Sequence, residues 1–368
     1  MRPFALPATF GLKTSFSYMD GFARPLYPDS WNRRRREAHD ILLDHRLNPD
    51  DITRADMVRV EDVAHNKARG ASCWNLTQIA LPSKDPNAKW TYRPSLEELS
   101  RPDFYAAVTN RLVPVVAELK ARGLFAGSYV YGFDEVEREY YPAMRRLYLQ
   151  FKRDFPDLPI MTTSFLCNDL ATGKTQLTDD VRVADWYCGG TRAYSPACRE
   201  KLRADGRQNW WYACLEPVYP CMNFGNWEYP LVEARLTPGM ATWLANADGF
   251  LYWHCNLWLE GDQAKIDEDG DTFFPDFQLV DVNGCCGDGA FLFPGRKGIL
   301  PGIRLANLRD GVEDWEILQL AADRIGRARV AAIVRRAVRS LCDFTRDPSA
   351  VTGVREALAE ALGQATGQ

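Results

Sequence analysis

Short apolar runs rich in β-branched and aromatic residues alternate along the chain with longer segments whose apolar positions recur at helical spacing. The runs predict eight strands, which cover residues 10–16, 46–52, 73–81, 125–131, 159–165, 183–188, 209–215 and 249–255. The longer segments predict helices over 31–46, 53–69, 103–122, 140–155, 195–204, 233–246 and 312–325. Alternation of this kind predicts parallel strands joined by right-handed crossovers. Eight units favour closure, so we expect an α/β protein built as a (β/α)8 TIM barrel.

The C-terminal residues continue the helical pattern. Apolar side chains recur from Val330 to Leu341 and again from Val351 to Leu362, which predicts two extra helices. The composition does not change abruptly anywhere along the chain. We therefore expect a single catalytic barrel over 1–368, with 327–368 as a helical extension packed on the barrel.

Charge and motif content exclude several classes of function. The formal net charge of −4 favours neither nucleic acid nor an anionic membrane as a partner. The sequence has neither a phosphate-binding P-loop nor a Gly-x-Gly-x-x-Gly run between a strand and a helix. Its four histidines and ten cysteines form no zinc-ligand pattern, so we expect no zinc site.

The N-terminus has no apolar segment typical of a signal peptide, and no apolar run is long enough to span a membrane. We therefore expect a cytoplasmic protein without membrane contact, in which the cysteines are buried free thiols.

The clearest candidate chemistry follows the fourth predicted strand. Asp134 and Glu135 come directly after the buried run FAGSYVY. The catalytic residues of such barrels stand at the carboxyl ends of the strands. Two carboxylates there can differ in pKa, so that one serves as an acid while the other stays ionised. The alternative is that Asp134 caps the next helix and Glu135 is a solvated residue of its first turn.

Other predicted strand ends carry amides, acids and aromatic rings, which suit a sugar site because hydroxyls need polar partners and a pyranose face packs on a flat ring. The expected substrate-binding residues are Tyr131, Asp185, Tyr187, Asn226, Trp227, Trp253 and Asn256. We expect three of the rings, Tyr187, Trp227 and Trp253, to line one pocket with the acid pair.

Three stretches resemble the catalytic domain of glycoside hydrolase family 123, the β-N-acetylgalactosaminidases. They are YGFDE at 131–135, the Gly-Asp-Gly to Glu-Asp-Trp run within 287–318, and HRLNPDD at 45–51. The resemblance implies an exo-acting, retaining β-N-acetylhexosaminidase whose nucleophile is the 2-acetamido oxygen of the carbohydrate substrate, an exception to the usual two-carboxylate scheme. Glu135 would then be the general acid and base, and Asp134 would orient the acetamido group and stabilise the oxazolinium charge. The resemblance also implies that the reaction requires no metal and no organic cofactor.

The chain also departs from the family pattern. Characterised members carry a β-sandwich before the barrel, and the first predicted strand here begins at about Phe10, so we expect that domain to be missing. The barrel flank left apolar would be covered by a homodimer or by the C-terminal helices. The long loop over 259–289 is expected to form a wall or lid of the site. Its acidic residues between Asp267 and Asp271 do not have EF-hand spacing.

Two other functions stay open at this point. The barrel could cleave a sugar without an acetamido group by using Asp185, Glu216 or Glu228 as the nucleophile. It could also be a non-catalytic carbohydrate-binding barrel, although such a barrel has no need of the Asp134–Glu135 pair.

Overall fold

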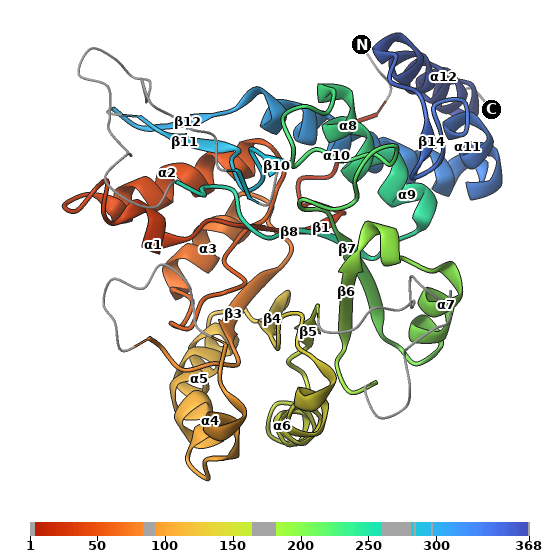
Figure 1. Cartoon of the computed structure of the whole chain (residues 1–368). Coiled ribbons are helices and arrows are strands. Elements are labelled where there is room, and N and C mark those ends of the chain that lie inside the picture. Colours follow the sequence, from red (N-terminus) through yellow and green to blue (C-terminus); the bar gives the residue numbers. More distant parts are fainter. Residues whose placement is uncertain are drawn as a thin grey trace.

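The computed structural model of the chain describes residues 4–83, 93–163, 182–258, 281–282, 285–295 and 297–366. Eight parallel strands form one sheet in the order β2-β1-β8-β7-β6-β5-β4-β3 (Figure 1). The strands are β1 (Lys13–Ser17), β2 (Pro49–Asp50), β3 (Trp74–Gln78), β4 (Ser128–Tyr131), β5 (Ile160–Thr162), β6 (Trp186–Gly190), β7 (Gln208–Tyr212) and β8 (Gly249–Tyr252). This order runs once around a barrel, so the predicted (β/α)8 fold is confirmed.

Helices cover the outside of the sheet. They are α1 (Asp20–Ala23), α2 (Trp31–Asp44), α3 (Val60–Ala68), α4 (Leu96–Ser100), α5 (Phe104–Ala121), α6 (Tyr141–Asp154), α7 (Pro196–Ala204), α8 (Leu231–Leu236), α9 (Thr242–Ala245) and α10 (Ile303–Ile325). Single turns of other helix types occur at η1 (Arg138–Tyr140), η2 (Thr191–Ala193) and η3 (Thr237–Ala241). Among the helices of the described residues, none has both the length and the apolar character needed to cross a bilayer.

The last barrel helix, α10, begins nine residues before the predicted start at 312. The sequence pattern suggested a glycine-rich loop there, and that prediction is wrong because Gly311 serves a packing contact inside the helix. A Cβ atom at this position would lie 2.3 Å from the carbonyl oxygen of Arg235 in α8. The glycine therefore allows the two helix backbones to touch.

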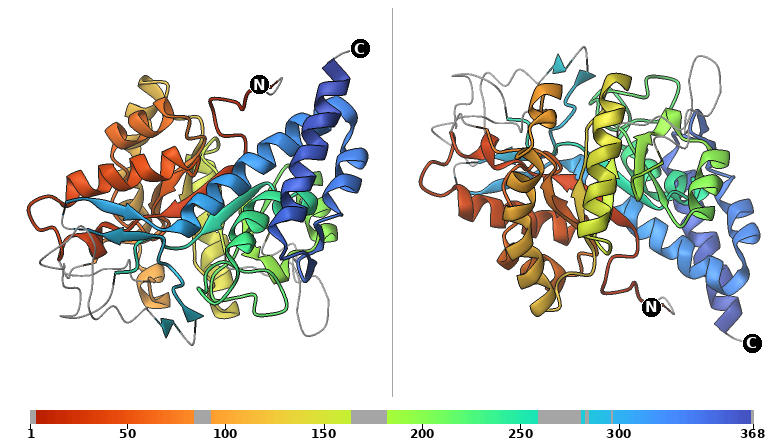
Figure 2. Two further views of the ribbon diagram at one scale, coloured as in Figure 1. Left: turned by 90° about the horizontal axis from the view of Figure 1, so that it is seen from above. Right: turned by 90° about the horizontal axis from the view of Figure 1, so that it is seen from below.

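Short hairpins and two further helices complete the chain. They are β9 (Asp281–Val282) with β10 (Cys285–Cys286), β11 (Leu292–Pro294) with β12 (Ile299–Pro301), α11 (Arg327–Val334), β13 (Val338–Ser340) with β14 (Asp343–Phe344), and α12 (Pro348–Thr366). Figure 2 shows α10, α11 and α12 side by side along one flank of the barrel. Val351, Val354 and Leu358 of α12 belong to the same buried apolar cluster as Phe16 and Tyr252 of the sheet.

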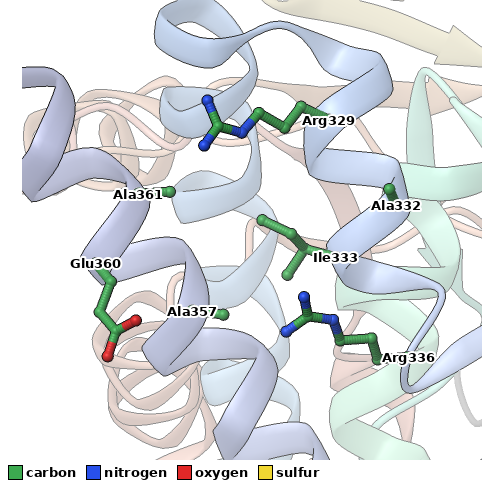
Figure 3. A pocket seen from close by; sticks show the side chains of 7 residues that line it. All are labelled: Arg329, Ala332, Ile333, Arg336, Ala357, Glu360 and Ala361. Carbon is green, nitrogen blue, oxygen red and sulfur yellow. The ribbon is translucent and has the colours of Figure 1, made fainter.

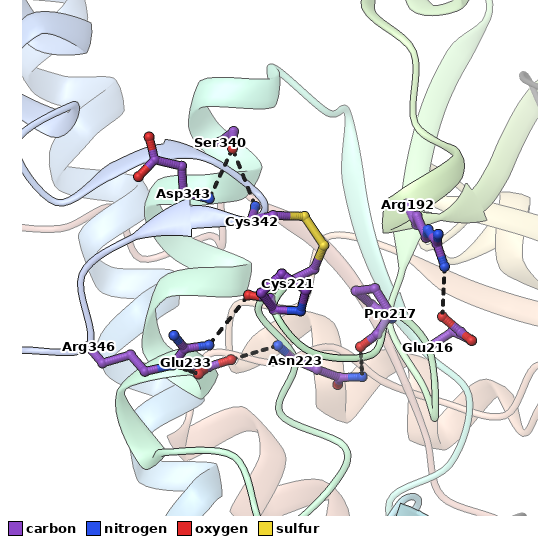
Figure 4. Close-up of a disulfide and its surroundings, with 11 residues drawn as sticks. Arg192, Glu216, Pro217, Cys221, Asn223, Glu233, Ser340, Cys342, Asp343 and Arg346 are labelled. Carbon is purple, nitrogen blue, oxygen red and sulfur yellow. Dashed lines mark hydrogen bonds and ion pairs between the residues drawn. A yellow bond between two sulfur atoms is a disulfide. The ribbon is translucent and has the colours of Figure 1, made fainter. Parts of the chain in front are cut away.

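A disulfide corrects two expectations about the C-terminal part. Cys221 and Cys342 are bonded, with their Cα atoms 3.9 Å apart (Figure 4). The prediction of free thiols is therefore wrong for this pair. The helix predicted to reach Leu341 ends at Val334 instead, because the following residues form the β13–β14 hairpin that carries Cys342.

The barrel closes between β2 and β3 largely through side chains. Asp50 accepts hydrogen bonds from the Asn75 backbone N–H at 3.1 Å, from the Tyr129 hydroxyl at 2.7 Å and from the Ser15 hydroxyl at 3.2 Å. Below it, the Asn48 side-chain oxygen accepts from the Ser72 N–H at 2.9 Å. These bonds replace a backbone ladder that the two-residue strand β2 is too short to supply.

Removing the Asp50 carboxylate tests this closure. In Asp50→Ala the Tyr129 hydroxyl and the Asn75 N–H lose their buried acceptor, so we expect the free energy of unfolding to fall by about 3 kcal/mol. Asp50→Asn keeps the shape and one acceptor and should cost less. Urea unfolding measures both variants, with the exposed Asp56→Ala as the control. Equal stability of Asp50→Ala and Asp56→Ala would contradict the role of Asp50.

Two buried histidines predict a dependence of stability on pH. Burial lowers the pKa of both His39 and His254 to about 3, whereas an unfolded histidine titrates near pH ~6.5. Below pH ~6.5 these histidines become protonated in the unfolded chain but stay neutral in the native state. Each histidine therefore lowers the free energy of unfolding by about 1.4 kcal/mol for every unit by which the pH falls. Burial raises the pKa of carboxyls such as Asp50, so these groups bind protons more readily in the native state than in the unfolded chain. They therefore raise the free energy of unfolding as the pH falls, which opposes the effect of the histidines.

The difference between wild type and His254→Gln isolates one histidine. Urea unfolding at several pH values from 7.5 to about 5 should show the curve of the variant falling less steeply in acid, by about 1.4 kcal/mol per pH unit. Parallel curves would show that His254 takes up a proton as readily in the native state as in the unfolded chain, and would contradict the prediction.

Candidate active site

Asp134 and Glu135 stand where the chain leaves β4 at the carboxyl end of the barrel. Gly132 lets the backbone pass Tyr148, because a Cβ atom there would lie 1.9 Å from the Tyr148 hydroxyl. Glu135 has a φ of 45°, a left-handed conformation that is uncommon for a residue with a side chain. Such a backbone persists only where the surrounding structure enforces it, and it is frequent at active sites.

Two hydroxyl groups hold the Asp134 carboxylate. Its Oδ1 atom accepts from the Tyr131 hydroxyl at 2.7 Å and from the Thr163 hydroxyl at 2.5 Å. The helix-capping alternative is wrong, because α6 begins only at Tyr141 and has no side-chain cap. Tyr131 is itself fully buried, so it supports Asp134 from below rather than facing a substrate.

Glu135 has a more open environment. Its side chain is exposed, and its Oε1 atom accepts a hydrogen bond from the Tyr212 hydroxyl at the end of β7. Burial, and next to it the charge of Glu135, raise the pKa of Tyr212, so this phenol stays a hydrogen-bond donor. The Glu135 N–H donates to Thr163 Oγ1 at 3.2 Å, and Thr163 therefore contacts both members of the acid pair.

Trp253 lies at the same mouth, directly after β8. Its half-buried ring packs on the apolar cluster inside the barrel, as does Tyr212. Its indole Nε1 donates to both oxygens of Asp288 at 3.2 Å. Trp227 lies against Phe293, with ring centroids 5.8 Å apart, and beside Gly287. The two tryptophans thus flank the same turn, which contains Asp288.

Two of the predicted substrate-binding residues lie elsewhere in the barrel. Asp185 precedes β6 and so lies at the opposite end, where it binds Lys152 Nζ at 2.6 Å. Tyr187 is fully buried and points outward into the apolar layer under α6 and α7. Both predictions are wrong because β6 begins and ends later than the pattern indicated, which moves its carboxyl end to Gly190.

The two predicted amides have structural partners. Asn256 is fully buried, and its side chain makes hydrogen bonds of 2.9 and 3.0 Å with the N–H and the carbonyl of Met19. It joins the ends of β1 and β8, so its predicted contact with substrate is wrong. Asn226 is 7% exposed, and its Oδ1 atom accepts from the Glu228 N–H at 3.0 Å. It shapes the loop that carries Trp227.

Sequence reasoning missed Thr163, Tyr212 and Asp288. Thr163 and Tyr212 stand at the ends of β5 and β7, and the rule that located the acid pair would have found both had those strand ends been placed correctly. Asp288 contributed to the resemblance only as part of a motif. Cys214 is a further neighbour, within electrostatic range of Glu135 and Asp288; burial first of all raises the pKa of its thiol to about 12, which keeps it protonated.

Nothing in the described part of the chain offers a metal site, since no group of three or more acidic, His or Cys side chains there could hold an ion. The acidic residues between 267 and 271, and most of the expected lid over 259–289, lie outside the described residues.

Two surface hollows lie away from the acid pair. One of about 600 Å³ is lined by residues of α2, α3 and α5. The other, of about 380 Å³, lies between α11 and α12, where Arg329 and Arg336 flank Ile333 (Figure 3). Asp134 and Glu135 line neither hollow, so the candidate active site is defined by its side chains rather than by these hollows.

Comparisons with known proteins identify the family of the chain. The family model for the catalytic domain of glycoside hydrolase 123 matches residues 82–321, which include the acid pair. A search of curated proteins finds no match. Among solved structures, a family 123 glycoside hydrolase from Clostridium perfringens, studied for glycolipid glycan hydrolysis, is similar over 98% of this chain and 70% of that one, with a TM-score of 0.64 and 11% identity.

The glycoside hydrolase domain of PelA from Pseudomonas aeruginosa is similar over 54% of this chain and 83% of its own, with a TM-score of 0.30 and 14% identity. The match of the family model covers most of the barrel and both carboxylates. The chain belongs to glycoside hydrolase family 123 and is a glycoside hydrolase.

Proposed function

We propose that the protein is an exo-acting, retaining β-N-acetylhexosaminidase that cleaves a terminal β-linked 2-acetamido sugar, in particular β-N-acetylgalactosamine. The supporting observation is the unequal environment of the two carboxylates. Within the described residues, both hydrogen bonds to the Asp134 carboxylate end on Oδ1, which leaves Oδ2 for the N–H of a substrate acetamido group. Glu135 is exposed, and the side-chain hydrogen bond that it accepts from the described part of the chain ends on Oε1.

Each environment suits one role in a substrate-assisted reaction. The acetamido oxygen attacks C1 while the glycosidic C–O bond breaks, and Glu135 gives its proton to the leaving oxygen. The positive charge that develops on the oxazolinium ring lies beside the fixed Asp134 anion, which stabilises it. Water then attacks C1 and its proton passes to Glu135. The bond between C1 and the acetamido oxygen breaks, which restores the acetamido group. The anomeric configuration is retained after two inversions.

The support around Asp134 fits this role because it is already in place before reaction. Tyr131 and Thr163 fix the carboxylate without neutralising it, so no side chain has to reorganise as charge develops. Trp253 supplies a flat ring at the mouth on which a pyranose face can pack.

A hydrolase for a sugar without an acetamido group is the second candidate function. It would need an enzyme carboxylate as nucleophile, and Asp185 is excluded by its place at the far end of the barrel. Glu216 and Glu228 are exposed on the loop after β7 and keep this alternative open. A purely carbohydrate-binding barrel has less support, because it would not need two carboxylates held in this way.

The substrate class, the location and the assembly are proposals too. The Clostridium perfringens relative hydrolyses glycolipid glycans, so a glycolipid head group belongs among the substrates to be examined. The cytoplasmic location expected from the sequence is opposed by the Cys221–Cys342 disulfide, because such bonds persist mainly in oxidising compartments. The homodimer expected from the sequence is a proposal that sedimentation can decide.

A panel of 4-nitrophenyl glycosides tests the proposed function. We expect turnover of the β-linked 2-acetamido sugars and none of the matching β-galactoside and β-glucoside, because these lack the nucleophile. A thiazoline analogue of the intermediate should inhibit competitively. Efficient cleavage of the plain glycosides together with indifference to the thiazoline would show that the mechanism is wrong and would point to Glu216 or Glu228.

Substitutions in the acid pair test the division of roles. Glu135→Gln should lower kcat by about 10²–10⁴-fold with a poor leaving group and by less with an activated aryl group, which needs little protonation. Asp134→Asn should lower kcat more than it raises KM, because the stabilised charge is absent from the ground state. The exposed Glu139→Gln is the control and should match wild type. A loss confined to KM in Asp134→Asn would contradict the assigned role.

A further inference from the structure

Asp288 is a fully buried carboxylate that the proposed mechanism does not use. Its Oδ1 atom accepts from the Tyr252 hydroxyl at 2.5 Å, and both of its oxygens accept from Trp253 Nε1 at 3.2 Å. No arginine or lysine of the described residues pairs with it. Burial raises the pKa of Asp288, while the bonds from Tyr252 and Trp253 act against that rise. Such a group is costly to bury, so its retention calls for a reason.

The glycines on either side bring this carboxylate close to both tryptophans. Gly287 has a φ of 92°, and a Cβ atom there would lie 2.0 Å from the Trp227 ring. Gly289 has a φ of 81°, and its Cβ would lie 2.9 Å from Leu257 and 3.4 Å from the Trp253 ring. The turn Gly287-Asp288-Gly289 is therefore wedged between the two rings, where residues with side chains would not fit.

We propose that Asp288 is a positioning residue that holds the Trp253 indole at the barrel mouth, so that one face of the ring forms the platform on which the sugar stacks. This inference rests on the proposed function for its sugar. The ring packs on the same interior cluster as Tyr212, whose hydroxyl binds Glu135. A fixed Trp253 ring thus determines how far a sugar stacked on it lies from the Glu135 carboxylate.

A carboxylate suits this task better than an amide. Both Asp288 oxygens lie 3.2 Å from the indole nitrogen, so either one accepts its proton. An asparagine would turn an NH₂ group toward the indole N–H or toward the Tyr252 hydroxyl, and one of these donors would lose its acceptor. The backbone also lies close to this carboxylate, since a Cβ atom at Gly225 would lie 2.8 Å from Asp288 Oδ1.

Fluorine NMR of protein labelled with 5-fluorotryptophan tests the positioning without any substrate. The Trp253 signal is assigned by its absence in Trp253→Phe. We expect Asp288→Asn to shift and broaden this signal while the thermal transition stays cooperative. The control, Asp248→Asn, changes a carboxylate that accepts from the Asn209 N–H at 2.8 Å next to the other end of β8, and it should leave the signal unchanged.

If Asp288→Asn does not fold, Tyr252→Phe replaces it. This variant removes one donor from Asp288 and keeps the ring in the core, and it should move the Trp253 signal in the same way by a smaller amount. An unchanged Trp253 signal in the folded variant would overturn the inference.

A double-mutant cycle tests whether the ring binds the sugar. With a 4-nitrophenyl 2-acetamido glycoside, Asp288→Asn should raise KM by about tenfold and change kcat less. A tenfold rise corresponds to the binding free energy of one aromatic contact. In the Trp253→Phe background the same substitution should raise KM no further, because Asp288 acts through that ring. Additive effects on KM would overturn the inference. A wild-type protein inactive on every acetamido sugar would instead refute the proposed function, and the fluorine spectra would still decide the positioning.

Discussion

The barrel closes between β2 and β3 through the buried Asp50 carboxylate, and the positions of all residues at the mouth depend on that closure. Strand β2 is only two residues long, so side chains of Asn48 and Asp50 supply what a backbone ladder supplies elsewhere. Asp50 also reaches across the interior to Tyr129 on β4, the strand that delivers the acid pair. The seam is therefore hydrogen-bonded directly to the strand that carries the acid pair, and a loose seam would loosen the candidate site.

The mouth shows a second use of buried polar groups. The two carboxylates argued to act on substrate are each held by a neutral hydroxyl donor from another strand end, Asp134 by Thr163 and Glu135 by Tyr212. The Trp253 ring is held in the opposite sense, because its indole N–H donates to the Asp288 carboxylate. Neutral hydroxyls orient a carboxylate without cancelling its charge, whereas an arginine would hold it by neutralising it. Rigid placement and an available charge are thus obtained together, which is what stabilisation of a developing cation requires.

The two errors at β6 share one physical origin. Side chains on a strand alternate between its two faces, so a displacement of the strand by one or two residues changes which side chains point inward and which residue stands at the end. For β6 this displacement placed Asp185 and Tyr187 at the mouth, whereas they lie at the far end and in the outer layer. The prediction for Asn256 failed for another reason. Its side-chain amide is hydrogen-bonded to the backbone of Met19, a residue far away in sequence.

The sequence by itself determined the alternation of strands and helices, hence the barrel, and it located Asp134 and Glu135 because a buried strand ends just before them. It also marked Trp253 and the Gly-Asp-Gly turn. Only the tertiary structure decided which donors hold these groups, since Thr163, Tyr212 and Asp288 come from different strand ends and loops that the local pattern cannot bring together. It likewise decided the pairing of Cys221 with Cys342, because contacts between residues so distant in the chain are set by the packing of the whole barrel.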